Sequence, residues 1–187
     1  MEGILQRFLQ GQSDRAEMLL QGFFSAIPHS LYSEMESFYH VFLLSVFRMS
    51  GIKTQPERRT AIGVIDLVID SPQHGYMVTE IKYAKSAKQT DTSNPASAVK
   101  ICAKDDRKLD SCVKAAFSQI IKKDYLLPNF RGQNPVRVVA ISVCGRNRVR
   151  IRSCPAKELL PWAHESLGAQ KPKKTVPWEA IFRKPES

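Results

Sequence analysis

The sequence predicts an α/β fold in which helices pack against a central β-sheet. Apolar residues recur with a helical period in some segments and form runs of strand length in others. The order of these segments is helix, three strands, helix, two strands. With 187 residues, of which 43% are hydrophobic, the chain is long enough for one domain with a substantial core. We expect a helical lead-in over residues 1–30, a core over residues 31–155 and a basic extension over residues 156–187.

Two segments near the N-terminus have helical patterns. Residues 13–27 begin with a loose capping box, which predicts the start of a helix. Residues 30–51 are apolar almost all round between Phe38 and Phe47 and end at Gly51, which predicts a buried helix.

Three strands follow. Residues 52–60 are polar and suit an edge strand, whereas residues 61–70 and 75–84 are strongly apolar. The segment 71–75 contains Pro and Gly and joins the two apolar strands as a hairpin.

The second half of the chain alternates again between loop, helix and strand. Residues 85–106 are rich in Ser, Thr, Asn, Asp and Lys, which predicts a long polar loop. Residues 109–127 have the apolar stripe of an amphipathic helix. Residues 136–144 suit a central strand, and residues 148–154 suit a strand that directs arginines outward.

The net charge of +10 points to a polyanionic partner. Residues 131–187 carry twelve Lys or Arg against four Glu, and therefore eight of the ten net positive charges. Such a region suits nucleic acid or an anionic membrane surface, although basic tails also occur simply as solvated ends. No apolar run approaches the roughly 20 residues of a membrane span, and the N-terminus lacks the layout of a signal peptide. We therefore expect a cytoplasmic protein with no membrane partner.

The four cysteines indicate reduced thiols. They include no C-x-x-C pair, and no histidine stands at zinc-finger spacing, so a structural zinc site is not expected. Buried or loop thiols of a reducing compartment are the better interpretation for Cys102, Cys112, Cys144 and Cys154.

The predicted hairpin brings two acids together. If residues 71–75 form the turn, Asp70 pairs with Tyr76 and Asp66 faces Glu80, with Cβ atoms about 4.5–5.5 Å apart. Like charges that face each other directly are destabilising, so this pair needs an explanation.

The face that these acids share is otherwise apolar, with Val64, Val68 and Val78 on it. Two carboxylates there need a cation between them, or one of them must take up a proton. Lys82 supplies one positive charge, beside the pair. Two structural alternatives remain: the register slips by one residue and turns one acid to the other face, or Lys82 and a neighbouring Arg neutralise the acids in a buried network.

Two further residues belong to the pattern. Glu36 is an acid early in a helix otherwise suited to burial, although an acid in a first turn is also favoured by the helix dipole. Gln119 lies beside the apolar stripe of the later helix, where an ordinary boundary amide would also fit.

Together, Glu36 on a first helix, Asp66 on the second strand, Glu80-Ile81-Lys82 on the third strand and Gln119 on the next helix resemble the PD-(D/E)XK nuclease superfamily. The chain is most similar to the nuclease-like domain found C-terminal to AAA-type ATPase modules in bacterial proteins, over about residues 20–152. The resemblance implies a restriction-endonuclease-like fold with an α-β-β-β-α-β core and a mixed central sheet flanked by helices.

One position departs from the pattern. The family often has Gly-Arg before the strand aspartate, and this chain has Gly63-Val64. The absent arginine bears on contact with substrate phosphate more than on metal binding, and Arg58 or Arg59 is a candidate replacement.

The resemblance implies hydrolysis of phosphodiester bonds with Mg²⁺, for which Mn²⁺ substitutes. Asp66, Glu80 and the Ile81 carbonyl then bind the ion, and Glu36 serves a second ion or a water. Lys82 orients or deprotonates the attacking water.

Other residues would hold the nucleic acid. Gln119 and Lys122 then position the scissile strand. Phosphates are held without sequence reading by Arg146, Arg148, Arg150, Arg152, Lys171, Lys173 and Lys174.

The leading hypothesis is a metal-dependent nuclease, with DNA favoured over RNA. The alternatives are a catalytically inactive nucleic-acid-binding module on the same fold, and a protein-interaction domain whose basic tail is only solubilising. Facing acids favour the enzyme, because a binding module does not need them. The sequence sets no oligomeric state.

Overall fold

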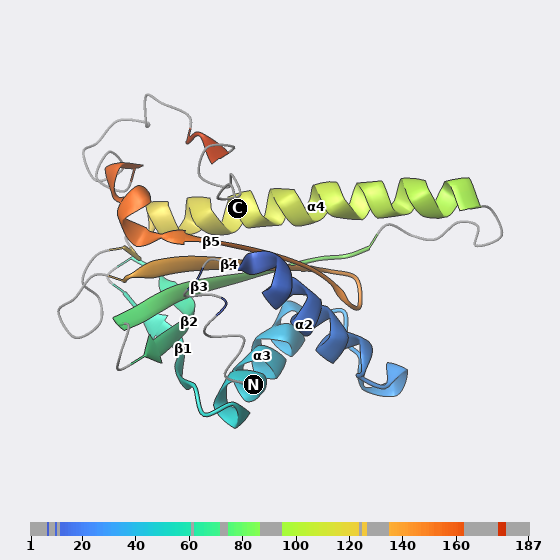
Figure 1. The fold of residues 1–187 in the computed structure, drawn as a ribbon, viewed down its shortest axis with the longest axis horizontal. Coiled ribbons are helices and arrows are strands. Elements are labelled where there is room, and N and C mark those ends of the chain that lie inside the picture. Colours follow the sequence, from blue (N-terminus) through green and yellow to red (C-terminus); the bar gives the residue numbers. More distant parts are fainter. Residues whose placement is uncertain are drawn as a thin grey trace.

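The structure, a computed structural model, is a sheet with helices on both faces (Figure 1). It describes residues 7, 10, 12–60, 62–71, 75–86, 95–123, 125–126, 135–162 and 176–178, with only the backbone described for 95–100. Helix α4 runs along one face of the sheet, and helices α2 and α3 lie on the other side. The α/β fold predicted from the sequence is confirmed.

The sheet has five strands in the order β1-β2-β3-β4-β5. Strands β3 and β4 are parallel, because α4 crosses over between them, and every other neighbouring pair is antiparallel. The sheet is therefore mixed, and β1 is an edge strand as predicted. The strands are β1 (Lys53–Arg59), β2 (Val64–Ser71), β3 (Gly75–Ala84), β4 (Arg137–Cys144) and β5 (Arg148–Pro155).

The helix predicted over residues 30–51 is shorter than expected. A single 3₁₀ turn, η1 (His29–Leu31), comes first, and α3 (Glu36–Met49) begins with Glu36 in its first turn. Gly51 follows the helix with a φ of 74°, a conformation that glycine adopts readily. The helix is also less buried than predicted, because Val41 is 64% exposed on the side away from the sheet.

The predicted polar loop over residues 85–106 is wrong for its second part. Helix α4 (Pro95–Lys122) begins at Pro95, a residue well suited to a first helical turn. The acids of this segment have partners elsewhere in the fold, since Asp105 accepts a hydrogen bond from Ser86 Oγ at 2.6 Å and Asp106 pairs with Arg148 at 2.8 Å. These long-range contacts stabilise the first part of the helix, before residue 109, where the sequence predicts a polar loop.

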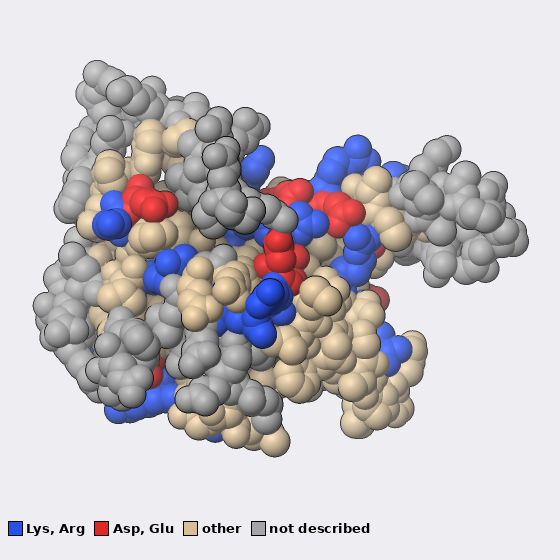
Figure 2. All heavy atoms as spheres, in the orientation of Figure 1, with Lys and Arg blue, Asp and Glu red and all other residues tan. Residues whose placement is uncertain are grey.

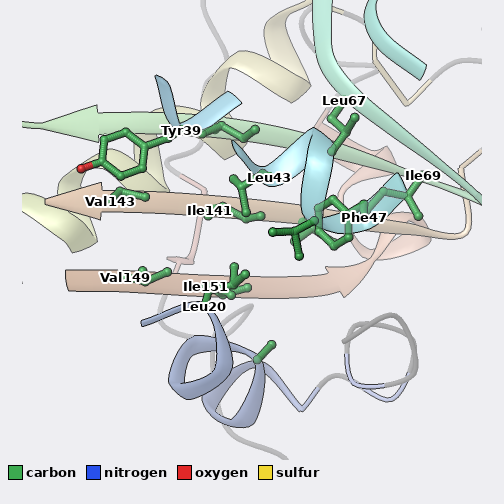
Figure 3. Packing of buried hydrophobic residues seen from close by; sticks show 14 of the residues in the cluster. Leu20, Tyr39, Leu43, Phe47, Leu67, Ile69, Ile141, Val143, Val149 and Ile151 are labelled. Carbon is green, nitrogen blue, oxygen red and sulfur yellow. The ribbon is translucent and has the colours of Figure 1, made fainter. Parts of the chain in front are cut away.

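Two hydrophobic clusters hold the layers together, one on each face of the sheet. The first joins α2 (Ser13–Ser25) and α3 to the sheet, where Leu20, Tyr39 and Phe47 are fully buried (Figure 3). The second joins α4 to the opposite face. Each fully buried side chain of this size contributes about 1.5–3 kcal/mol to folding.

Helix α2 also covers the open edge of β5. Glu17 Oε1 accepts a hydrogen bond from the Ile151 amide at 2.7 Å, and Gln21 Nε2 donates to the Val149 carbonyl at 3.2 Å. Side chains of α2 thus form hydrogen bonds with backbone groups of β5 that could otherwise pair with another strand.

The hairpin register is as predicted, with Asp70 opposite Tyr76. Its last pair is Leu67 with Thr79, so the ladder stops one position before Asp66 and Glu80.

Strand β2 also breaks its pairing with β1 at Asp66. The β1–β2 register passes from Pro56↔Leu67 to Arg58↔Ile65 and omits Glu57, which has a φ of 50°. Ile65 packs with the α4 cluster, whereas Leu67 packs with the α2–α3 cluster, so the alternation of faces is interrupted between them.

One detail of the predicted face is therefore wrong. Val68 and Val78 lie in the α4 cluster as expected, but Val64 is 43% exposed and Ile65 takes the buried place.

No helix in the described part of the chain has the length and apolar character needed to cross a bilayer. All four cysteines are free thiols, with Cys144 and Cys154 buried and Cys102 and Cys112 carried by α4.

Candidate active site

Two of the predicted acids bind the backbone of β3 at the point where β2 leaves it. The Ile81 amide donates a hydrogen bond to Asp66 Oδ2 at 2.8 Å, and the Tyr83 amide donates to Glu36 Oε2 at 3.0 Å. Residues 81 and 83 direct their amides to the same edge of the strand, because peptide directions alternate along it. Side chains from β2 and α3 therefore take the place of a strand partner.

The same geometry bears on the Ile81 carbonyl. A strand residue directs its N–H and its C=O to the same neighbour, so this carbonyl lies on the edge that faces Asp66. The Ile81 carbonyl oxygen is therefore directed to the side of β3 where Asp66 lies, as its predicted role as a metal ligand requires.

Glu80 is fully buried, with 0% of its surface exposed. Its Oε1 accepts a hydrogen bond from Lys82 Nζ at 2.7 Å, while its Oε2 is buried without a hydrogen-bond partner among the described residues. Burial and the negative charge of Asp66 raise the pKa of Glu80 to about 8, against the opposing effect of Lys82. Without a further cation, the carboxyl group holds a proton over much of the neutral range.

Lys82 remains charged in this arrangement. Burial acts to lower the pKa of its ammonium group, but the hydrogen bond and charge of Glu80 outweigh it, and the net shift is upward. Asp66 and Glu36 add to this effect. Lys82 is therefore a donor that can orient a water or a phosphate oxygen.

His40 joins the acids from one turn further along α3. Its Nε2 lies 3.8 Å from Asp66 Oδ2 and 4.0 Å from Glu36 Oε1. This nitrogen is buried and has no hydrogen-bond partner in the described part of the chain. The sequence analysis assigned His40 no role. The spacing of four residues between Glu36 and His40 was the available signal.

The sequence profile of the PD-(D/E)XK nuclease superfamily matches residues 34–153. The chain belongs to this superfamily. The match runs from just before α3 into β5 and thus includes every element that carries the acids and Lys82. The mixed sheet flanked by helices is the restriction-endonuclease-like fold expected for it. No curated protein matches the sequence.

Gln119 contacts this site through a tyrosine that the sequence did not single out. Its side chain hydrogen-bonds the phenol of Tyr125, whose hydroxyl donates to the Val64 carbonyl at the start of β2. Burial raises the pKa of Tyr125, and the charges of Glu80 and Asp66 act in the same direction.

Gly63 makes room for that phenol. A Cβ atom at this position would lie 2.8 Å from the Tyr125 hydroxyl oxygen and 3.1 Å from its Cε1. In this superfamily member the glycine before the strand aspartate therefore allows a tyrosine to hold the start of β2.

The four arginines predicted to hold phosphates all make contacts within the chain. Arg146 donates to the Ile27 carbonyl. The other three pair with acids of α2 and α4: Arg148 with Asp106, Arg150 with Asp106 and Asp110, and Arg152 with Glu17. Figure 2 likewise shows Lys and Arg interspersed with Asp and Glu on the visible face. Lys122 is exposed at the end of α4, and Lys171, Lys173 and Lys174 lie outside the described residues.

The donors of this site suit a hard divalent cation. Within the described residues, no three His, Cys, Asp or Glu side chains stand at metal-ligand spacing. Even so, Glu80 Oε2 is buried without a hydrogen-bond partner among the described residues, and burial and the charge of Asp66 raise the pKa of this carboxyl group, so a cation beside it would fit. A bound cation would take the place of the proton on Glu80.

Proposed function

We propose that this protein is a metal-dependent nuclease that hydrolyses phosphodiester bonds, with DNA as its substrate. The observation that carries the proposal is the buried Glu80, hydrogen-bonded to Lys82 on one oxygen and unpartnered on the other, beside the carboxylate of Asp66. A domain that only bound nucleic acid would lose nothing by replacing these buried charges with apolar side chains.

Asp66, Glu80 and the Ile81 carbonyl would hold Mg²⁺ or Mn²⁺, and Glu36 would hold a second ion or a water. The ion, when bound, supplies charge neutralisation at the phosphoryl group and activation of water. The backbone amides of Ile81 and Tyr83 hold Asp66 and Glu36 in place.

Lys82 has two tasks in this proposal. Its ammonium group orients the attacking water and stabilises the negative charge that develops on the phosphate. Its raised pKa supports the role of donor over that of base.

Substrate contacts would come from Lys122, near the end of α4, and from Gln119 on the same helix. The four arginines are weaker candidates for this task, since acids of the chain already compensate Arg148, Arg150 and Arg152, and Arg146 donates to the Ile27 carbonyl. We also propose the nearer relationship to nuclease-like domains C-terminal to AAA-type ATPase modules, and a cytoplasmic setting, which the four free thiols support.

The test is a cleavage assay on plasmid DNA, linear DNA and RNA with Mg²⁺ or Mn²⁺, comparing wild type with Glu80→Gln. This variant keeps the shape of the side chain and removes its charge. We expect metal-dependent cleavage of DNA by wild type and none by the variant. Binding of DNA without cleavage in either ion would refute the nuclease and leave the binding module.

A further inference from the structure

The imidazole of His40 faces the acids of the proposed site but bonds to neither of them. Its separations of 3.8 Å from Asp66 Oδ2 and 4.0 Å from Glu36 Oε1 are too long for hydrogen bonds. Two ligands of one ion, each about 2.1 Å from it, lie about 3.0–4.2 Å apart as the angle between them widens from 90° to 180°. The measured separations fall within that span.

The burial of this nitrogen gives the second observation. Nε2 is shielded from solvent and lacks a partner among the described residues, and buried polar atoms are rarely left in that state. The lone pair of a neutral imidazole nitrogen that is buried beside carboxylates can bind a cation.

Hydrogen bonds from backbone amides of β3 hold the carboxylates of Asp66 and Glu36 beside His40. One oxygen of Glu36 is held by the Tyr83 amide, and its other oxygen is the one nearest to Nε2. Asp66 is held by the Ile81 amide, which donates to Oδ2, the same oxygen that lies 3.8 Å from Nε2. Helix α3 presents Glu36 and His40 one turn apart, so both donors move as one rigid element.

We propose that His40 Nε2 is a nitrogen ligand of the divalent cation at this site, and that it biases the site towards Mn²⁺ over Mg²⁺. The inference rests on the proposed nuclease function and names the ion that the function would use. Mg²⁺ takes hard oxygen donors and keeps several of its waters. An imidazole favours first-row transition-metal ions over Mg²⁺, and Mn²⁺ is the one of these that also suits carboxylate and carbonyl ligands. A site made only of Asp66, Glu80, Glu36 and the Ile81 carbonyl would lack this bias.

The deciding experiment observes the ligand directly and needs no nucleic acid. Pulsed electron paramagnetic resonance of Mn²⁺ bound to the intact protein reports nitrogen coupled to the metal. We expect an imidazole nitrogen signal in wild type that changes frequency when the protein is labelled with ¹⁵N-histidine. The signal should be absent in His40→Gln and unchanged in His29→Gln, a matched control because His29 is exposed on η1.

Calorimetric titration gives the second readout. His40→Gln should lower the affinity for Mn²⁺ by about tenfold or more and change that for Mg²⁺ by less than about threefold. Equal losses for both ions would overturn the proposed preference and indicate a role in packing. If His40→Gln does not fold, the isotope-labelled wild type still decides whether histidine binds the metal.

The outcomes separate this inference from the function on which it rests. Mn²⁺ that binds wild type without a nitrogen signal, and is lost in Glu80→Gln, would overturn the role of His40 and leave the proposed nuclease standing. Failure of wild type to bind either ion would overturn both.

Discussion

The carboxylate of Asp66 accepts a hydrogen bond from the amide of Ile81 at 2.8 Å. The β2–β3 ladder ends at Leu67 and Thr79, so beyond that pair a side chain of β2 bonds to the backbone of β3 in place of the β2 backbone. The break in the ladder is what frees this carboxylate to turn towards β3. Beside it, Glu80 is buried with a raised pKa, and the two acids together account for the expected sensitivity of the protein to metal and pH.

Mg²⁺ or Mn²⁺ should raise the melting temperature of wild type, and Asp66→Asn should abolish that rise. An ion that binds only the folded state stabilises it by mass action. In the absence of metal we expect this variant to be neutral or slightly more stable, because it removes a charge that opposes ionisation of Glu80.

Differential scanning fluorimetry with and without the ions measures both effects. Asp110→Asn is the matched control, since Asp110 pairs with Arg150 on α4 and β5 and should keep the full metal response. Strong destabilisation of Asp66→Asn without metal would instead support a buried ion network.

Stability of the metal-free protein should fall as the pH rises from about 5 to about 8. The folded-state pKa of Glu80 is raised from 4.5 to about 8, so within this window the folded state binds more protons than the unfolded state. Raising the pH therefore favours unfolding. Urea denaturation in the presence of a chelator should show this slope in wild type and a smaller one in Glu80→Gln. Identical pH profiles would show that Glu80 does not titrate in this range.

Lys82→Ala should lower the rate of DNA cleavage by about 10²–10³-fold while DNA binding weakens only slightly. The ammonium group acts at one position in the transition state, whereas phosphate affinity is spread over many cations. Single-turnover cleavage at saturating enzyme gives the rate, and binding in Ca²⁺ gives the affinity. Lys114→Ala, at an exposed position of α4, serves as the control for a lost positive charge. A parallel loss of binding and rate would indicate that Lys82 holds substrate and does not act on the reaction.

Gly63→Ala should destabilise the protein by about 1–3 kcal/mol, because a Cβ there would lie 2.8 Å from the Tyr125 hydroxyl oxygen and force the phenol away. The shift would also break the hydrogen bond from Tyr125 to the carbonyl of Val64, two residues before Asp66. Gly22→Ala is the control, since no atom lies within 4 Å of a Cβ in that helix and the change should stabilise by about 0.5–1 kcal/mol. Denaturant unfolding checks both, and an unchanged Gly63→Ala would mean that Tyr125 has room to move.

The sequence by itself determined the strand order around the hairpin and the register of Asp70 with Tyr76. Both follow from local rules, since a turn of set length and a side-chain period of two leave one pairing that buries the apolar residues. The same rules placed Glu36 early in a helix and Glu80 and Lys82 on one face of a strand.

Only the tertiary structure decided how these residues meet. The break at Asp66 lies opposite Glu57 of the neighbouring strand, and the place of His40 depends on how α3 packs against the sheet. The start of α4 and the pairing of the arginines rest on acids far away in the chain, such as Asp106 with Arg148. The periodicity of apolar residues indicates which face of a helix or strand is buried. Ion pairs between residues far apart in the sequence leave no periodic pattern, so they can be recognised only in the folded structure.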